Sequence, residues 1–259
     1  MPSQGFSSRW LEAAADLEPV SILIAEHRVT EQALNCLERI AERWSAPGRR
    51  EQLDCQAVQE AIVFFQVFVE TWHFRREETY FGLAGVSLAS VAIDDDGTCT
   101  FHDHELCSMH LRSIEEAVRV IHSREQTSSS VHSDDAQTAS GTFDAEMALP
   151  AEVSAAYRKF GEHARAYSDI LLRHIENEED FIYPTIQRRA TPEDKQAAVE
   201  AFRRASRAAV DWRRVDDCLA IVDRLAERFG VAPQTSSIRE LNRRESPKPD
   251  EISNFVPDS

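Results

Sequence analysis

The chain has 259 residues, of which 42% are hydrophobic, so it is long enough for one large domain with a core of its own. Its formal net charge of −16 argues against nucleic acid and anionic membrane surfaces as partners. The longest apolar run, from Ala61 to Val69, is too short to cross a bilayer, and no signal peptide is visible. The five cysteines are scattered, as is typical of reduced thiols, and we expect a cytoplasmic protein.

Apolar residues recur at helical spacing along most of the sequence, and almost no segment alternates with period two. This pattern predicts an all-α fold with four main helices. Their expected ranges are about 19–44, 51–81, 101–123 and 150–189. We therefore expect a four-helix up-down bundle with an additional helical segment at the C-terminal side.

The remaining segments have compositions of their own. Residues 124–146 are serine-rich, polar and aperiodic, which is typical of a flexible insert. Thr191, Pro192 and Asp194 have the spacing of a helix start with a capping box, and Gly230 fits a helix end. The predicted organisation is an N-terminal extension (1–17), a bundle (18–190), a C-terminal helical extension (191–230) and a disordered tail (231–259). The insert and the tail are the surfaces where we would expect a protein partner.

Ionisable residues replace apolar ones at corresponding points of two predicted helices. The stretches are WHFRREETYF at 72–81 and RHIENEEDFIYP at 173–184. In each, a histidine stands four positions before a glutamate, which places both on one helix face. These pairs are His73 with Glu77 and His174 with Glu178. A lone buried carboxylate is very costly, and a cation held by both groups removes that cost.

The other two helices add one histidine each. His27 follows Glu26 in the first helix, and His104 follows Asp103 in the third, where His102 and His110 are its rivals. Four histidines and two glutamates are too many for one tetrahedral zinc and suit two metals bridged by the glutamates. Imidazole with carboxylate favours iron or manganese without excluding zinc. The alternative is a metal-free bundle whose histidines and glutamates form surface salt bridges.

The sequence resembles the hemerythrin-like HHE cation-binding family, whose members are four-helix bundles with a non-haem di-iron centre. The resemblance covers roughly residues 18–187 apart from the insert. The stretches that carry it are EHRVTEQAL at 26–34, WHFRREETYF at 72–81, DHELC at 103–107 and HIENEEDFIYP at 174–184. The spacing differs from the Glu-x-x-His of ferritin-like bundles, and the HExxH of metalloproteases is absent.

The resemblance implies a cofactor and a set of ligands. The cofactor would be two iron ions (Fe2+/Fe3+) with an oxo or hydroxo bridge. Terminal ligands would be His27, His73, His104 and His174, and the carboxylate bridges would be Glu77 and Glu178. The residues expected to orient the imidazoles through their free N–H groups are Glu26, Glu78, Asp103 and Glu179.

One departure from the oxygen-carrying hemerythrins changes the expected function. Those proteins have five histidines, with a His-x-x-x-His pair on the third helix, but here Ser108 stands four positions after His104. His110 lies about 120° away from His104 around the helix and cannot replace the missing ligand. One iron would then hold water or an open position. We expect a protein that binds O2, NO or peroxide in iron, redox or nitrosative stress handling; the alternatives are an iron or oxygen sensor or regulator, and an iron donor for iron–sulfur cluster repair.

Two further expectations concern the surroundings of the centre. Tyr80, Phe81, Tyr167 and Phe181 should pack around it. His163 precedes His174 by eleven residues, or about three helical turns, so it cannot share the metals. No residue is assigned a catalytic role.

Overall fold

The computed structural model of the chain describes residues 18–45, 54–83, 100–131, 150–208 and 212–232. Regular structure in these ranges is entirely helical, and the described residues include no strand. The expected all-α class is therefore confirmed. Within the same ranges, no helix combines the length and the apolar character that crossing a membrane would need.

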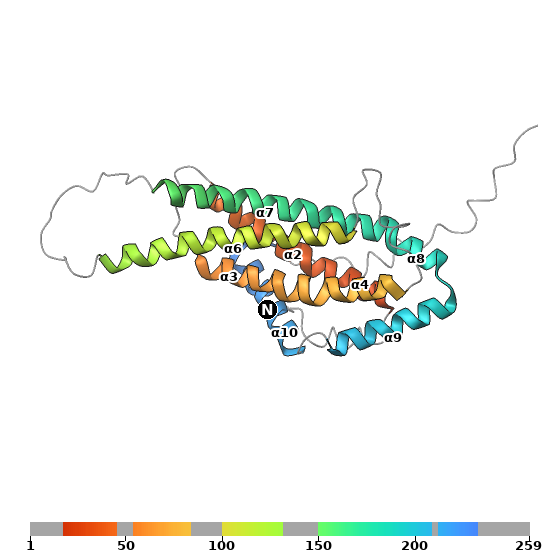
Figure 1. Ribbon diagram of the computed structural model, residues 1–259. Helices are drawn as coiled ribbons and strands as arrows, with labels where there is room; N and C mark the ends of the chain where they lie inside the picture. The colour runs from red at the N-terminus through yellow and green to blue at the C-terminus, as the bar shows by residue number, and fades with distance from the viewer. Residues whose placement is uncertain (1–17, 46–53, 84–99, 132–149, 209–211, 233–259) are drawn as a thin grey trace, which may run out of the picture.

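Four long helical runs lie side by side, and two further helices pack on their outside (Figure 1). The first run is α2 (Pro19–Ser45), and the third is α6 (Thr100–Val131). The second run consists of α3 (Cys55–Phe64), the π-helix η1 (Phe65–His73) and α4 (Phe74–Leu83). The fourth consists of α7 (Ala151–Asn177), the π-helix η2 (Glu178–Ile182) and α8 (Tyr183–Arg189). The outer helices are α9 (Pro192–Ala208) and α10 (Trp212–Phe229).

The apolar side chains of these runs form two main clusters along the length of the molecule, and a third, small cluster contains Cys55, Ile121 and Ala156. The larger one takes residues from α2, α3, η1, α6, α7 and α10, and Phe65, Phe160 and Leu171 are among its buried members. The smaller one contains Tyr80 and Tyr183 together with residues from α2 and α9. His27, Glu77 and Glu178 fall between the residues of one main cluster and those of the other along their helical runs, and His73 and His174 lie at the adjoining edge of the larger cluster. The polar site is therefore a layer between two hydrophobic clusters.

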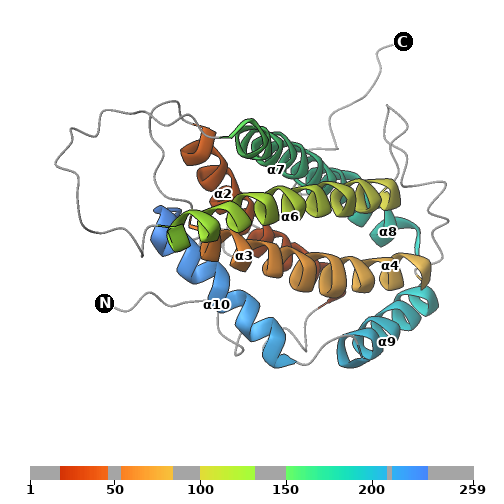
Figure 2. The same cartoon turned by 60° about the vertical axis from the view of Figure 1, so that its left-hand side comes forward.

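The C-terminal helices start and stop as the sequence predicts. Thr191 Oγ1 accepts the backbone N–H of Asp194 at 3.1 Å, and Asp194 Oδ2 accepts the backbone N–H of Thr191 at 3.2 Å, which is a capping box. At the other end Gly230 has a φ of +66°, and the N–H of Val231 donates to the carbonyl of Ala226 at 2.9 Å. Figure 2 shows α10 alongside α3 and α9 beside α4, and both pairs are in contact.

Two of the expected boundaries differ from the structure. The helix α6 continues to Val131, so the first eight residues of the expected insert 124–146 are helical. A formed helix extends at little cost through polar residues when no Gly or Pro interrupts it, and none does before Val131. At the C-terminal side Val231, the first residue of the expected tail, packs against the larger apolar cluster. The extension 1–17, insert residues 132–146 and tail residues 233–259 lie outside the described residues.

We expect the larger cluster to dominate stability. Phe160 is fully buried beside Trp44, with 4.3 Å between the ring centroids, and Phe160→Ala should lower the free energy of unfolding by about 3–5 kcal/mol. The matched control is Phe181→Ala, because Phe181 is 65% exposed and its truncation should cost less than about 1 kcal/mol. Urea unfolding followed by circular dichroism measures both; similar losses in the two variants would contradict this account of the core.

Candidate metal centre

Six side chains from the four long runs meet in the polar layer. Among the described residues, two groups could hold a metal ion, and within each group the ligand atoms all lie within 4.8 Å of one another. One group consists of His27, His73, Glu77 and Glu178, and the other of Glu77, His104, His174 and Glu178. The two groups share both glutamates and divide the four histidines equally. All six residues are at most 6% exposed.

Each histidine directs Nε2 toward the two glutamates. His174 Nε2 lies 3.2 Å from Glu178 Oε1 and 3.7 Å from Glu77 Oε2. His104 Nε2 is 3.5 Å from Glu77 Oε2 and 3.3 Å from His174 Nε2. On the opposite side, His27 Nε2 lies 3.4 Å from Glu178 Oε2, and His73 Nε2 lies 3.8 Å from Glu77 Oε2. The lone-pair side of every imidazole therefore converges on the same two carboxylates.

The opposite ring nitrogen of each histidine faces a second carboxylate. The four Nδ1-to-oxygen pairs are His27–Glu179 (2.9 Å), His73–Glu26 (3.0 Å), His104–Glu78 (3.0 Å) and His174–Asp103 (3.8 Å). An acceptor at Nδ1 fixes the tautomer with hydrogen on Nδ1 and leaves Nε2 free to bind a cation. These are the four residues that the sequence predicts as orienting partners.

The pairing crosses between helices. Glu26 is the neighbour of His27 in α2, yet it bonds His73 in η1. Likewise Asp103 is the neighbour of His104 in α6, yet it lies against His174 in α7. Each carboxylate therefore ties its own helix to an imidazole on another. The sequence identifies these four acidic residues, but the exchange of partners depends on tertiary packing.

Glu26 also binds a buried arginine. Trp72 Nε1 donates to Glu26 Oε1 at 2.9 Å, and the guanidinium of Arg76 forms an ion pair with the same oxygen. That guanidinium lies between two rings, 4.2 Å from the centroid of Trp72 and 4.6 Å from that of Phe202 in α9. Burial lowers the pKa of Arg76 to about 9, so the group stays cationic at neutral pH and balances the charge of Glu26.

Tyr183 also belongs to the centre, although the helical pattern of the sequence does not predict it there. Its hydroxyl lies within donating distance of Glu77 Oε1, at 2.7 Å, and of Glu178 Oε2, at 3.0 Å. In an α-helix, position 183 would lie about 140° around the axis from position 178. The π turn η2 reduces this offset, because it is wider than an α turn: the N–H of Tyr183 donates to the carbonyl of Glu178, five residues earlier.

The same π turn accounts for a second error. Phe181 follows Glu178 by three positions, which in an α-helix would place both on one face. In the structure Phe181 is 65% exposed, so the expectation that it packs around the centre is wrong. Tyr80 and Phe81 do lie in the smaller apolar cluster with Tyr183, as expected.

The two glutamates have opposite protonation tendencies. Burial and the negative charge of Glu77 hold the pKa of Glu178 well above its usual range. Burial also acts to raise the pKa of Glu77, but the neighbouring imidazoles, His73 first, outweigh it and leave that pKa well below the usual range. The ligand oxygens of Glu77 and Glu178 lie within 4.8 Å of each other, and two carboxyl groups at that distance repel each other when both are ionised. In the absence of metal we therefore place a proton on Glu178.

On the side of the layer formed by His27 and His73, burial favours the neutral form of both imidazoles. Burial lowers the pKa of His27 to about 4 and also lowers the pKa of His73. Burial acts in the same direction on His174, but its contacts with Asp103 and Glu77 outweigh it, and the pKa is raised. Charge is therefore distributed unevenly between the two groups.

Unsatisfied acceptors show that the residues fit a cation. Glu77 Oε2 and Glu178 Oε1 are buried and accept no hydrogen bond from the described residues. An unpaired buried carboxylate oxygen is expensive, and each of these two atoms lies within 3.5 Å of an imidazole Nε2, of His104 or of His174. Positive charge placed among these atoms would satisfy all of them together.

The other histidines of α6 and α7 lie outside the two groups. His102 is exposed, with Glu105 as a weak partner at 3.9 Å. His110 does not join the centre and instead contacts His163. Among the rivals on α6, the structure therefore brings only His104 to the two glutamates.

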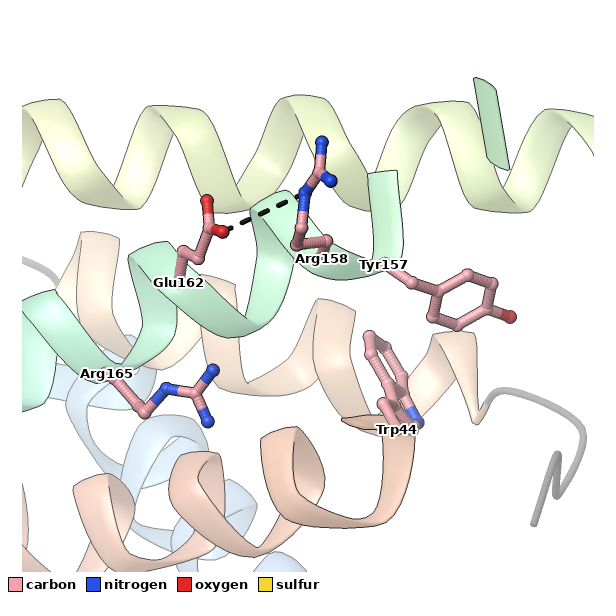
Figure 3. Close-up of a pocket in the computed structure, with 5 residues that line it drawn as sticks. All are labelled: Trp44, Tyr157, Arg158, Glu162 and Arg165. Carbon is pink, nitrogen blue, oxygen red and sulfur yellow. Dashed lines mark ion pairs between the residues drawn. The ribbon is translucent and has the colours of Figure 1, made fainter. Parts of the chain in front are cut away.

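A surface groove of about 300 Å3 lies far from this layer (Figure 3). Trp44 lines one side, and Tyr157, Arg158, Glu162 and Arg165 of α7 line the other, with Glu162 directed at Arg158. Trp44 follows His27 by 17 residues, which is about 25 Å along the helix. The groove is therefore not an access route to the candidate ligands.

Comparisons with known proteins name no relative. The chain matches no family model, no curated protein and no solved structure.

Removing the hydroxyl of Tyr183 should destabilise the metal-free protein. Tyr183→Phe leaves buried carboxyl oxygens without a partner, and we expect a loss of about 1–3 kcal/mol in unfolding free energy. Tyr167→Phe is the matched control, because the buried hydroxyl of Tyr167 has no hydrogen-bond partner among the described residues and its removal should be neutral or stabilising. Urea unfolding with excess chelator measures both, and the reverse order of stabilities would refute the assigned contacts.

Removing one orienting carboxylate should weaken metal binding without unfolding the chain. Glu78 bonds His104, and its side chain is 43% exposed, so Glu78→Gln should fold normally. We expect divalent-cation affinity to fall about tenfold or more, as for other partners of metal-bound histidines. Competition with a chromophoric chelator measures this. Glu105→Gln, at a side chain 83% exposed on the same helix as His104, should leave the affinity unchanged; equal affinities in both variants would count against the pairing.

Proposed function

We propose that the protein is a hemerythrin-like four-helix up-down bundle that holds two iron ions and binds O2, NO or peroxide there. The observation that carries this proposal is the pair of four-residue groups that share Glu77 and Glu178. Because both glutamates belong to both groups, two adjacent cations would be bridged by two carboxylates. Each cation would also have two imidazoles of its own: His27 and His73 for one, His104 and His174 for the other.

The donors of each group suit iron, the metal that the sequence resemblance implies, and they would also suit zinc. Structural zinc is satisfied by four protein ligands in a tetrahedron, which each group would supply completely. Non-haem iron accepts histidine and carboxylate ligands and retains open positions for a small molecule. Two such ions with four protein donors each would leave room for an exogenous ligand at either ion.

The enclosure of the layer favours a small ligand over a bulky one. The six candidate ligands are almost completely buried, and the two apolar clusters close the layer on both sides. A diatomic gas or a peroxide could reach such a site through fluctuations of the bundle, whereas a bulky substrate could not. This agrees with a role in iron, redox or nitrosative stress handling.

The residues of the chain then have distinct tasks. The six side chains hold the ions, and Glu26, Glu78, Asp103 and Glu179 keep the imidazoles in one tautomer. Tyr183 holds a proton beside both bridging carboxylates, since burial and the nearby charges keep its pKa well above the usual range. When bound, iron would supply Lewis acidity and electrons to the small ligand.

A sensor role is the second candidate, and the contact between Arg76 and α9 favours it. His73 is linked through Glu26 to Arg76, and Arg76 is covered by Phe202 of α9. A change at His73 would thus be transmitted to the C-terminal extension. Amide hydrogen exchange with and without iron separates the two functions: a sensor should lose protection in α9 without iron, whereas a site that only binds or converts its ligand should change only near the layer.

Metal analysis tests the ligand assignment. Protein purified without chelator should contain two irons per chain, and its visible spectrum should change on exposure to O2, NO or peroxide. Glu77→Gln and His174→Ala should lose most of the iron, because each removes a donor from a buried set whose members act together. The His163→Ala variant should keep both irons, since His163 lies about three helical turns from His174. Two irons in the first two variants would exclude the assignment.

A further inference from the structure

A second pair of histidines meets where α6 and α7 lie side by side (Figures 1 and 2). His110 of α6 and His163 of α7 bring their Nδ1 atoms to 2.8 Å, with ring centroids 5.0 Å apart. Both side chains are partly exposed. The proposed iron centre does not use this pair, and no apolar packing argument requires two imidazoles at this position.

The pair is separate from the buried layer. His163 precedes His174 by eleven residues, which is about 16 Å along the helix axis. His110 follows His104 by six residues, or about 9 Å. The buried side chains of Cys107 and Tyr167 occupy the intervening positions of the two helices. An ion at His110 and His163 could therefore not be shared with the glutamates of the centre.

We propose that His110 and His163 form a surface site for a divalent transition-metal ion of tetragonal geometry, Cu2+ in the first place. Two imidazole nitrogens bound at about 2.0 Å to one ion are about 2.8 Å apart at a right angle and about 3.3 Å apart at the tetrahedral angle. The two Nδ1 atoms, which are within hydrogen-bond distance of each other in the metal-free chain, lie 2.8 Å apart, a separation equal to the first value. Right-angle coordination is typical of Cu2+ and Ni2+, and Cu2+ binds such ligands more tightly than Ni2+ or Zn2+.

Charge and protonation also favour this occupant. Burial and the neighbouring His163 lower the pKa of His110, so its nitrogen lone pair is available near neutral pH. Among the described residues no third His, Cys, Asp or Glu completes the pair, so water fills the remaining positions. The net charge of −16 attracts cations to the surface as a whole.

Copper titration of the full-length, iron-loaded chain tests the site. We expect the wild-type protein to bind one Cu2+ equivalent that His110→Ala and His163→Ala each lose. The matched control is His102→Ala, an exposed histidine of the same helix, and it should retain that equivalent. Because the readout is the difference between variants at equal iron content, failure of the iron proposal would not affect it. Equal copper binding in all four proteins would overturn the proposal.

Paramagnetic resonance of the wild-type protein gives a second test that needs no substitution. One Cu2+ equivalent should give a tetragonal spectrum with hyperfine coupling to two nitrogens, and equimolar Zn2+ should not displace it. A spectrum of aqueous copper, or one without coupled nitrogen, would show that His110 and His163 only share a hydrogen bond.

Discussion

The structure depends on two carboxyl groups, those of Glu77 and Glu178, which are buried together with too few hydrogen-bond donors to satisfy both. Glu77 and Glu178 are fully enclosed, and one oxygen of each accepts no hydrogen bond from the described residues. Burying such groups costs several kcal/mol unless positive charge compensates them. The four imidazoles whose Nε2 atoms face these oxygens could do so only by taking up protons, which burial opposes for His27 and His73. A shared pair of cations, as we propose, would resolve this conflict.

The rest of the molecule encloses that layer and positions its side chains. Apolar clusters on both sides exclude water and fix the positions of the four helical runs. The exchanged carboxylate partners then orient each imidazole from a neighbouring helix, as Glu26 does for His73. The same residue ties the layer to α9 through Arg76 and Phe202. The C-terminal extension therefore completes the burial of a charge that belongs to the site.

Helical periodicity was sufficient to predict most of the fold and the six candidate ligands. His73 and Glu77 lie on one helix face, as do His174 and Glu178, as their four-residue spacing predicts. The spacing holds because η1 ends at His73 and η2 begins at Glu178, so the residues between the partners of each pair are α-helical. Tyr183 was not predicted at the centre, and Phe181 was wrongly predicted there, because a π turn is invisible to a pattern that assumes about 100° per residue. The contact between His110 and His163 and the exchanged carboxylates depend on how helices dock, which a single sequence does not encode as a local pattern.

Anomalous X-ray scattering at the iron edge, from crystals grown without chelator, tests the central claim most directly. The account predicts two anomalous peaks a few Å apart, both within bonding distance of Glu77 and Glu178, one beside His27 and His73 and the other beside His104 and His174. A single peak, peaks elsewhere, or glutamate side chains turned away from the peaks would contradict it.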